Sequence, residues 1–428
     1  MQYIIVGNGV ASVGAVEGIR SRDEQGTITI VSREGDKTYG RPLISHYLAG
    51  NVPEKRMLLR PDGFYERNNV QLQLDRDVES IDCSQKIISS DKGDLEYDRL
   101  LLATGGNPIF PPIEGATGPD VYTFISLDDA RKVNSVVKDM RRAVVIGGGL
   151  IGLKASEALF DRGVDVTVVE LSSRILSAAF DDIAGNIVSE RLQNMGFDIR
   201  CSTTVNKIKR GDDNRVKGVF LQDGVFLEAD AVVVAIGVVP SIELAQRAGL
   251  NTNRGIVVDE KLQTSAENVY AAGDVAEAVD LLWEDNRVTP IWPNAYAQGL
   301  YAGRNMAAGM EGEEEYEGGL AMNSIEFYGL PTVSIGIVNP PESSSFEVKA
   351  NLDESRSRYR KLIFSEDRLV GCVLVGDISL AGRYNAFIRF KIKLDSKTKS
   401  RLIAGNPTSL QWPEKKFRQE WNKRARLA

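Results

Sequence analysis

The first 31 residues alternate apolar and polar segments in a way that predicts a strand, a helix and a second strand. An apolar run at 3–6 leads into a glycine-rich turn at 7–12, and a second apolar run follows at 27–31 after a helix-length segment from 11 to 20. Short apolar runs that flank a helical segment are typical of parallel strands buried on both faces. The opening of the chain therefore predicts a βαβ unit.

The same pattern returns about 140 residues later. Apolar runs at 143–146 and 164–169 flank a turn at 147–152 and a helix-length segment from 150 to 161. Two βαβ units in one chain predict an α/β fold with two Rossmann-like dinucleotide-binding domains.

Both turns follow the spacing Gly-x-Gly-x-x-Gly, which lets the backbone turn tightly and approach a pyrophosphate at a helix N-terminus. A single such turn is a weak signal, but two, each after a strand and before a helix, indicate one fold that holds two dinucleotides. Serine is small enough to replace the third glycine of the first turn. The three spacing positions are Gly7, Gly9 and Ser12 in the first turn and Gly147, Gly149 and Gly152 in the second.

An acidic residue follows the second strand of each unit. Glu34, just beyond the run 27–31, is expected to accept hydrogen bonds from a ribose, with a surface loop acid as the alternative. Glu170 ends the strand of the second unit, where a carboxylate accepts from both ribose hydroxyls and repels a 2′-phosphate. This favours NADH over NADPH, although Arg174 nearby leaves NADPH open as the alternative.

Three further apolar runs end in small or acidic residues, at 102–106, 234–237 and 269–274. Small residues at a strand end let the backbone pass close to a nucleotide, and an aspartate there suits a ligand hydroxyl. The residues expected to line the nucleotides at these ends are Ala103, Thr104, Gly105, Gly237, Gly273 and Asp274.

Length and composition predict several domains. A chain of 428 residues is longer than one hydrophobic core usually accommodates, and its 43 % apolar content is enough to fill more than one. No run of 18 apolar residues occurs and Met1 leads directly into the first strand, so we expect a soluble cytoplasmic protein. Cys83, Cys201 and Cys372 lie far apart in no metal-binding or redox spacing. A redox disulfide and a cysteine-ligated cluster are therefore excluded within this chain, no metal site is predicted, and the chemistry must depend on a bound cofactor.

The formal charge of -7 is unevenly distributed. Residues 391–428 carry eleven Lys and Arg against three Asp and Glu, together with Trp412, Phe417 and Trp421. Such a basic tail suits docking on an acidic partner, and a tail folded back on its own acidic body is the alternative, with nucleic acid disfavoured. The acidic segment 311–317 is expected to be a solvated turn, with partner steering as its alternative.

Taken together and in this order, the motifs resemble the flavoprotein family of pyridine nucleotide reductases, which bind FAD in the first fold and NAD(P)H in the second. The resemblance extends from residue 1 to about 390. The chain is most similar to the cysteine-free branch, which includes NADH-dependent rubredoxin and ferredoxin reductases and the FAD subunits of large NADH-linked dehydrogenases. The deciding segment is 39–46, Tyr-Gly-Arg-Pro-Leu-Ile-Ser-His, which is similar to the branch's Y-x-R-P-x-L-S-K beside the flavin ring.

The resemblance implies a role for each of these motifs. It assigns the first glycine turn and Glu34 to the FAD adenosine and pyrophosphate, Gly273 and Asp274 to its ribitol and phosphate, and the second turn with Glu170 to NADH. The flavin edge is assigned to Arg41, Pro42 and Ser45. The segment 292–299, with Trp292 and Ala295, resembles a helix start below the isoalloxazine, whose dipole stabilises negative charge on the reduced flavin. The alternative is that Trp292 and Tyr296 are plain core aromatics.

One position pair departs from the family pattern. The family usually places a Lys at position 46 and a Glu at position 154, whereas this chain has His46 and Lys154. Our hypothesis is that Lys154 lies near the flavin and nicotinamide and stabilises the anionic reduced flavin, with His46 as its neighbour. The alternative for His46 is a hydrogen-bonded core imidazole.

The resemblance also implies the domain organisation. We expect an FAD-binding domain from 1–115 and 246–319, an NAD-binding domain at 116–245, and a C-terminal α+β interface domain at 320–390, before the tail 391–428. Alternating apolar residues near 322–331 and 359–364 predict that the C-terminal domain holds a small antiparallel sheet.

The expected function is FAD-dependent electron transfer between NAD(H) and an iron-sulfur or rubredoxin-like protein. We expect the chain to be the NAD-linked flavin subunit of a multisubunit dehydrogenase of the phenylglyoxylate- or aldehyde-oxidising kind, with larger subunits as partners and a homo-oligomer as a further expectation. The alternatives are a free-standing NADH:rubredoxin or ferredoxin reductase and a non-catalytic FAD/NADH redox sensor.

Overall fold

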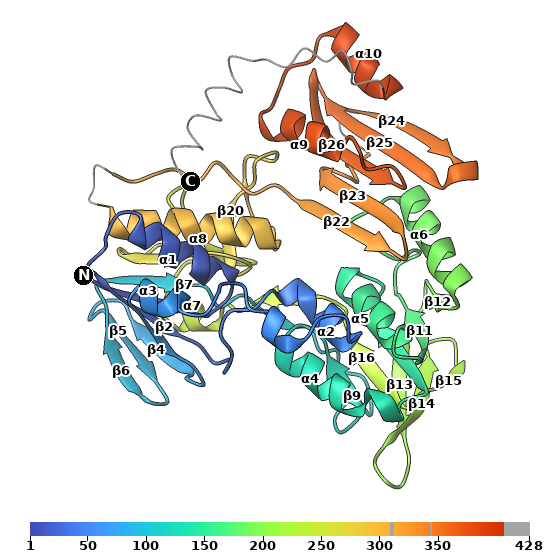
Figure 1. Ribbon diagram of the computed structural model, residues 1–428, viewed down its shortest axis with the longest axis horizontal. Helices are drawn as coiled ribbons and strands as arrows, with labels where there is room; N and C mark the ends of the chain where they lie inside the picture. Colours follow the sequence, from blue (N-terminus) through green and yellow to red (C-terminus); the bar gives the residue numbers. More distant parts are fainter. Residues whose placement is uncertain (309–311, 343–344, 406–428) are drawn as a thin grey trace. The chain divides into compact units, whose positions relative to one another are not determined.

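The computed structural model describes residues 1–308, 312–342 and 345–405. The chain divides into two compact units, Met1–Met322 and Asn323–Ala428. The predicted α/β fold with two Rossmann-like domains and a C-terminal α+β domain is confirmed (Figure 1).

The first sheet of unit one has the strand order β19-β7-β1-β2-β3, and its neighbouring strands are all parallel. Its strands are β1 (Gln2–Val6), β2 (Thr27–Val31), β3 (Val70–Gln73), β7 (Arg99–Leu102) and β19 (Val269–Ala271). Apart from β3 and the first residues of the strands, their side chains are mostly buried, as the continuous apolar runs predict. Because the strands are parallel, their carboxyl ends meet at one edge of the sheet.

Helices α1 (Val10–Arg20) and α8 (Trp292–Ala307) pack side by side over this sheet (Figure 1). Glycines make the close approach possible, since a Cβ on Gly14 would lie 2.3 Å from the Tyr296 carbonyl oxygen and one on Gly303 would lie 2.2 Å from that of Ala15. A Cβ on Gly299 would lie 1.9 Å from the Ala11 carbonyl oxygen. The two helices are therefore parallel, and both begin at the carboxyl edge of the sheet.

The second sheet has the order β12-β11-β10-β16-β9, again with all neighbours parallel. Its strands are β9 (Val121–Thr123), β10 (Arg142–Ile146), β11 (Asp165–Val169), β12 (Asp198–Arg200) and β16 (Ala231–Val234). Helix α5 (Leu150–Phe160) follows β10 as α1 follows β1. The internal repeat expected from the hydrophobic pattern is therefore present in the structure.

Smaller elements complete unit one. The short sheets contain β4 (Val78–Asp82), β5 (Ile87–Ser90) and β6 (Gly93–Glu96); β13 (Val205–Arg210), β14 (Val216–Leu221) and β15 (Phe226–Glu228); β8 (Gly106–Pro108) and β17 (Val238–Pro240); and β18 (Ile256–Val257), β20 (Ala276–Val279) and β21 (Asn286–Arg287). The remaining helices are α2 (Ile44–Leu48), α3 (Phe64–Arg67), α4 (Leu127–Val136), α6 (Asp182–Met195) and α7 (Glu243–Arg247).

Unit two is built on a sheet of order β22-β23-β26-β25-β24, in which β23, β26, β25 and β24 pair antiparallel. Its elements are β22 (Met322–Phe327), β23 (Leu330–Gly336), β24 (Phe346–Asp353), β25 (Arg358–Ser365), β26 (Arg368–Val375), α9 (Ala381–Arg389) and α10 (Ser396–Ala404). The alternation that predicted an antiparallel sheet is confirmed. Of the basic tail, residues 391–405 are described, whereas Trp412, Phe417 and Trp421 lie outside the described residues.

The acidic segment near residue 314 is paired with basic side chains. Glu313 forms an ion pair with Lys261, and Glu314 pairs with Arg22 and, at 3.3 Å, with Arg304. The Arg304 side chain is 5 % exposed, so these contacts hold the segment against unit one. The expectation of a solvated turn is therefore wrong for Glu313 and Glu314, whereas Glu315 and Glu317 are exposed and Glu311 lies outside the described residues.

Within the described ranges, no helix has the length and apolar character that a membrane crossing requires. The same part of the chain contains no cluster of three or more His, Cys, Asp or Glu side chains suited to a metal ion.

Candidate functional site

The first candidate site lies at the carboxyl edge of the first sheet. Gly7 follows β1, Ala103 follows β7 and Gly273 follows β19, so the parallel register brings these strand ends together. Gly7 has φ +109°, and a Cβ there would lie 2.1 Å from the Ala103 carbonyl oxygen. Only glycine fits this position, because the chain turns in the left-handed region against the neighbouring strand end.

The helix N-termini beyond both glycine turns open onto free space. Gly9 caps α1 and Gly149 caps α5, each with an extended backbone. A Cβ added at either glycine would meet no atom within 4 Å. Unpaired backbone N–H groups at a helix N-terminus, with free space over them, suit a pyrophosphate, so both turns fit a dinucleotide.

The third position of each turn differs for a steric reason. The Ser12 hydroxyl, which is fully buried, donates to the Gly7 carbonyl oxygen at 2.6 Å. In the second turn a Cβ on Gly152 would lie 1.9 Å from the Gly147 carbonyl oxygen. The first turn therefore accommodates a serine, and the second requires glycine.

Glu34 is held by two side chains from the segment 39–46. The Tyr39 hydroxyl donates to Glu34 Oε2 at 2.9 Å, and Arg41 forms an ion pair with the same carboxylate. Burial lowers the pKa of Arg41, but the neighbouring Tyr39 and Glu34 raise it by a larger amount. The net shift of the Arg41 pKa is therefore upward. Glu34 is thus held in place at the sheet edge, with its side chain 37 % exposed.

Asp274 lies near Arg41 at the same edge. Burial raises the pKa of the Asp274 carboxyl, and the positive charge of Arg41 opposes the shift. The backbone N–H of Gly273 donates to Gln298 Oε1 of α8 at 2.8 Å, which ties this strand end to the helix. The edge therefore presents the carboxylates of Glu34 and Asp274 with Arg41 in the electrostatic field of both.

The start of α8 adjoins this edge, since a Cβ on Gly273 would lie 3.6 Å from that of Ala295. Trp292, at the first helical position, is 38 % exposed, so its interpretation as a core aromatic is wrong. Tyr296 is partly buried, and its hydroxyl donates to Glu17 Oε2 of α1 at 2.6 Å. The N-terminal turn of α8 carries no acidic residue.

The second candidate site repeats this arrangement on the second sheet. Glu170 accepts from the Gly148 N–H at 2.6 Å and from the Ser172 N–H at 2.7 Å. Arg174 pairs with Asp182 at 2.7 Å and donates to the Phe180 carbonyl oxygen. The guanidinium that could have accommodated a 2′-phosphate is therefore already bound to other groups of the protein. These contacts favour NADH.

The backbone around this second turn is as constrained as that of the first. Gly147 has φ +110°, and a Cβ there would lie 2.3 Å from the Ala235 carbonyl oxygen at the end of β16. Gly237, with φ +130°, follows the same strand.

The other residues expected at a flavin edge lie at 41–45 and at the end of β7. Arg41 and Pro42 form a short 3-10 turn directly before α2, and Ser45 is buried in α2. Thr104 Oγ1 donates to the Ser241 carbonyl oxygen at 3.1 Å, and the Gly105 carbonyl oxygen accepts from the Ser241 N–H at 2.9 Å. The end of β7 is therefore joined to the strand β17 that returns from the second sheet.

Lys154 and His46 lie on two helices that pack together, α5 and α2. Lys154 Nζ is 2.5 Å from Oε2 of Glu157, one turn further along α5, and Glu157 is 9 % exposed. His46 is exposed, so the interpretation as a core imidazole is wrong. The sequence analysis missed Glu157, although its spacing of three residues from Lys154 on a helix is a recognisable pairing signal.

Sequence reasoning also missed Arg131 of α4, which joins the two halves of unit one. Its guanidinium donates to Asp36 Oδ1 and Oδ2, both at 2.8 Å, and to Glu54 Oε1 at 2.6 Å. No sequence signal could have found this contact, because Arg131 and Asp36 are 95 residues apart on solvent-facing segments.

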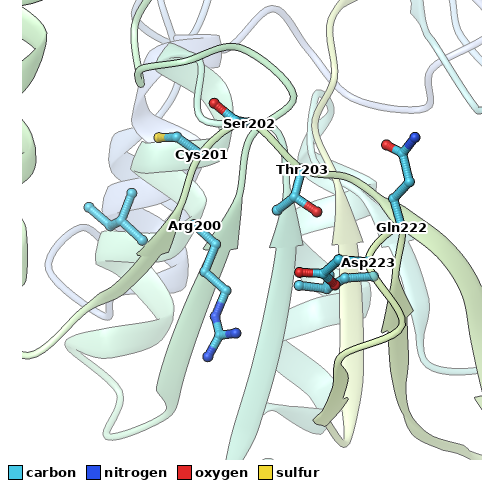
Figure 2. Close-up of a pocket in the computed structure, with 8 residues that line it drawn as sticks. Arg200, Cys201, Ser202, Thr203, Gln222 and Asp223 are labelled. Atoms are coloured by element: carbon cyan, nitrogen blue, oxygen red, sulfur yellow. The ribbon is translucent and has the colours of Figure 1, made fainter.

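A cavity of about 640 Å³ borders the strand next to Glu170 (Figure 2). It is lined by residues 199–203 at the end of β12 and 221–223 at the end of β14. Burial and the Glu170 carboxylate both raise the pKa of the Cys201 thiol in its wall. The sequence analysis did not expect this cavity.

Known proteins share this fold and these motifs. The family model described as pyridine nucleotide-disulphide oxidoreductase matches residues 1–299, and the model described as rubredoxin NAD+ reductase C-terminal domain matches residues 322–392. The NADH-dependent phenylglyoxylate dehydrogenase subunit epsilon of Aromatoleum evansii is 33 % identical over 367 residues, which cover 86 % of each chain.

Two further proteins place these matches in context. Nitrite reductase [NAD(P)H] of Bacillus subtilis is 32 % identical over 404 residues, 94 % of this chain but 49 % of that protein, so the chain spans about half of its length. A solved covalent putidaredoxin reductase-putidaredoxin complex has a chain that superposes with a TM-score of 0.86 at 25 % identity, covering 96 % of this chain and 99 % of that one.

Proposed function

Because the chain belongs to the pyridine nucleotide-disulphide oxidoreductase family, we propose that it carries electrons between NAD(H) and an iron-sulfur or rubredoxin-like protein through bound FAD. Its cofactors are FAD and NAD(H). The observation that carries the proposal is the pair of open helix N-termini at Gly9 and Gly149, each with a fixed carboxylate, Glu34 or Glu170, at the adjoining strand end.

Each site would hold its cofactor through a distinct set of residues. The FAD residues would be Gly7, Gly9, Ser12, Glu34, Arg41, Pro42, Ser45, Ala103, Thr104, Gly105, Gly273, Asp274, Trp292 and Ala295, and the NADH residues would be Gly147, Gly149, Gly152, Glu170 and Gly237. When both cofactors are bound, they supply hydride transfer between nicotinamide and flavin. The protein would bind the rings in a stacked arrangement and exclude water from between them.

Charge near the flavin is the protein's further contribution. The α8 N-terminus carries a partial positive charge and has no acidic residue in its first turn, so it would stabilise negative charge on the reduced ring. Lys154 would add a full positive charge, which the Glu157 contact positions and partly offsets. His46, exposed on the helix that packs against α5, would be its neighbour.

The absence of paired cysteines in the sequence supports an external acceptor. Cys83, Cys201 and Cys372 are free, and Cys372 is fully buried in unit two. Electrons would therefore leave the flavin directly for a protein partner. The free thiols also suit a cytoplasmic location.

We favour a role as the NAD-linked flavin subunit of a multisubunit dehydrogenase over a free-standing reductase. The phenylglyoxylate dehydrogenase subunit, which is named as part of a larger enzyme, is matched over 86 % of its length and supports this choice. The putidaredoxin reductase complex supports the wider proposal of a small iron-sulfur partner. We propose the domain limits 1–115 with 246–319 for FAD, 116–245 for NAD and 320–390 for the interface domain.

The testing experiment is an anaerobic titration of the FAD-loaded chain with NADH, followed by addition of a rubredoxin, a [2Fe–2S] ferredoxin or a dye. Flavin bleaching by NADH and reoxidation by one protein acceptor support the proposal. Bleaching with the dye as the only effective acceptor points to a missing complex partner, which affinity purification from the native host would identify. A flavin that NADH reduces but that neither a protein acceptor nor the dye reoxidises in steady turnover would instead support the redox sensor.

A further inference from the structure

Arg131 joins helix α4 to the part of unit one that is proposed to bind FAD, through Asp36 and Glu54. The guanidinium makes a two-pronged contact with Asp36, at 2.8 Å on each oxygen, and reaches both oxygens of Glu54, at 2.6 and 3.2 Å. The Arg131 side chain is 34 % exposed and that of Asp36 is 25 % exposed. An isolated exposed ion pair contributes little, but a planar fork shared by two carboxylates fixes geometry as well as charge.

Asp36 links this fork to the first glycine turn. The Asn8 side-chain amide, between Gly7 and Gly9, donates to the Asp36 carbonyl oxygen at 3.0 Å. The Thr38 hydroxyl donates to Asn8 Oδ1 at 2.6 Å. The loop that receives Arg131 therefore also positions the backbone expected to bind the FAD pyrophosphate.

The same loop holds the first residue of α4. The Leu127 N–H, which has no partner within its own helix, donates to the Tyr39 hydroxyl at 2.9 Å. Tyr39 in turn donates to Glu34, and Arg41 Nη1 donates to the Ile125 carbonyl oxygen at 3.0 Å. Two separate contacts, Leu127 with Tyr39 and Arg41 with Ile125, thus join the start of α4 to the residues around the proposed ribose acceptor.

On its other side, α4 is continuous with the second sheet. It directly follows β9, which pairs in parallel with β16, and β16 pairs with β10, the strand that enters the second glycine turn. A displacement of α4 would therefore move the second nucleotide site relative to the first.

We propose that Arg131 is a positioning residue, whose fork to Asp36 and Glu54 fixes the second nucleotide-binding sheet against the first glycine turn so that the two bound rings meet. The inference rests on the proposed function, because the alignment matters only if a hydride passes between the rings. Arg131 contacts neither expected ring. It acts through Asp36, Glu54 and α4.

The test compares wild type with Arg131→Met, which removes the fork, and Arg131→Lys, which keeps the charge without the fork. Arg142→Met is the matched control, because Arg142 also forms an ion pair, but with Glu228, which lies in the second half itself. Three properties are measured: the rate constant of flavin reduction at saturating NADH per bound flavin, the long-wavelength absorbance of stacked flavin and nicotinamide, and amide exchange of residues 121–136 in flavin-free protein.

We expect Arg131→Met to retain FAD but to reduce its flavin about tenfold or more slowly, since small displacements of reacting groups carry large kinetic costs. Its stacking absorbance should weaken and exchange around Leu127 should quicken. In Arg131→Lys the rate constant, the stacking absorbance and the amide exchange should all lie between those of Arg131→Met and those of wild type. In Arg142→Met all three should equal the wild-type values.

A rate constant per bound flavin equal to that of wild type in both Arg131 variants would overturn the inference, even if they lost FAD or stability. Unchanged exchange at 121–136 in flavin-free protein would overturn it independently. Failure of NADH to reduce the wild-type flavin would refute the proposed function, and the exchange measurement would still show whether Arg131 fixes α4.

Discussion

The backbone N–H of Gly148 donates to the Glu170 carboxylate at 2.6 Å, so the second glycine turn itself holds the acid at the end of β11. The Ser172 N–H fixes the other oxygen at 2.7 Å. A carboxylate held at both oxygens keeps its position at the proposed ribose site. This relationship explains why the second site should discriminate against a 2′-phosphate.

Replacement of Glu170 tests that discrimination. Glu170→Ser removes the charge and the acceptor of the ribose hydroxyls, and we expect kcat/KM for NADH to fall about ten- to a hundredfold, the cost of hydrogen bonds to a charged group. The value for NADPH should rise or stay constant. Steady-state kinetics with a dye acceptor measure both, with Glu228→Ser as the control. An unchanged NADH to NADPH ratio would contradict this role.

The two glycine turns should respond differently to added bulk. Gly152→Ala places a methyl group 1.9 Å from the Gly147 carbonyl oxygen, and we expect a loss of about 1–3 kcal/mol of stability with weaker NADH binding and normal FAD content. Ser12→Ala keeps the Cβ and loses one hydrogen bond, at a cost of about 1 kcal/mol.

Urea unfolding and titration with NADH measure both effects. Gly382→Ala is the control, because Gly382 is also a helical glycine without a positive φ and has no atom within 4 Å of the added carbon. If Gly152→Ala were as stable as wild type and bound NADH normally, the steric argument would be wrong.

The Lys154–Glu157 pair predicts opposite shifts of the flavin midpoint potential. Lys154→Glu removes the positive charge, so the reduced flavin should lose stability and the potential should fall by about 30 mV or more. Glu157→Gln removes the negative charge that lies 2.5 Å from Lys154 Nζ, so the potential should rise. Spectroelectrochemical titration measures both potentials. A potential and a hydride-transfer rate unaffected by Lys154→Glu would remove Lys154 from the flavin site.

Asp274 predicts a pH-dependent stability in flavin-free protein. Because burial raises its pKa in the folded state, Asp274 favours folding at low pH, and this contribution is lost as pH rises through the folded pKa. The free energy of unfolding of Asp274→Asn relative to wild type should therefore improve as pH rises from about 3 to about 7.

Asp285 supplies the control of opposite sign. Arg287 lowers its pKa, so its stabilising contribution is present above the ordinary range for aspartate and is lost as pH falls. The free energy of unfolding of Asp285→Asn relative to wild type should therefore decrease over the same rise in pH. Urea unfolding across this range checks both slopes, and parallel profiles for the two variants would refute the assignment for Asp274.

Local patterns were enough to predict much of the fold. The apolar runs at 3–6 and 143–146 and the glycine turns after them predicted both βαβ units, because strands and helices have their own periods along the chain. The strand ends at Ala103, Gly237 and Gly273 were found from the same runs, since parallel strands end at a common edge.

Other contacts gave no local signal. The Glu34–Tyr39–Arg41 cluster lies within eight residues, yet its pairing depends on how the loop closes against α4. The acidic segment near Glu314 looked solvated because its partners, Arg22 and Arg304, are recognised only when α1 and α8 have packed together.

The sequence by itself determined two dinucleotide folds, their glycine turns and the acids that follow them, because these features depend on residues close together in the chain. Only the tertiary structure decided how the two halves are joined. The fork of Arg131 to Asp36 spans 95 residues, and the Leu127 N–H reaches Tyr39 across 88. Long polar side chains on surface loops follow no period, so such partners become visible only when the folded chain brings them within hydrogen-bond distance.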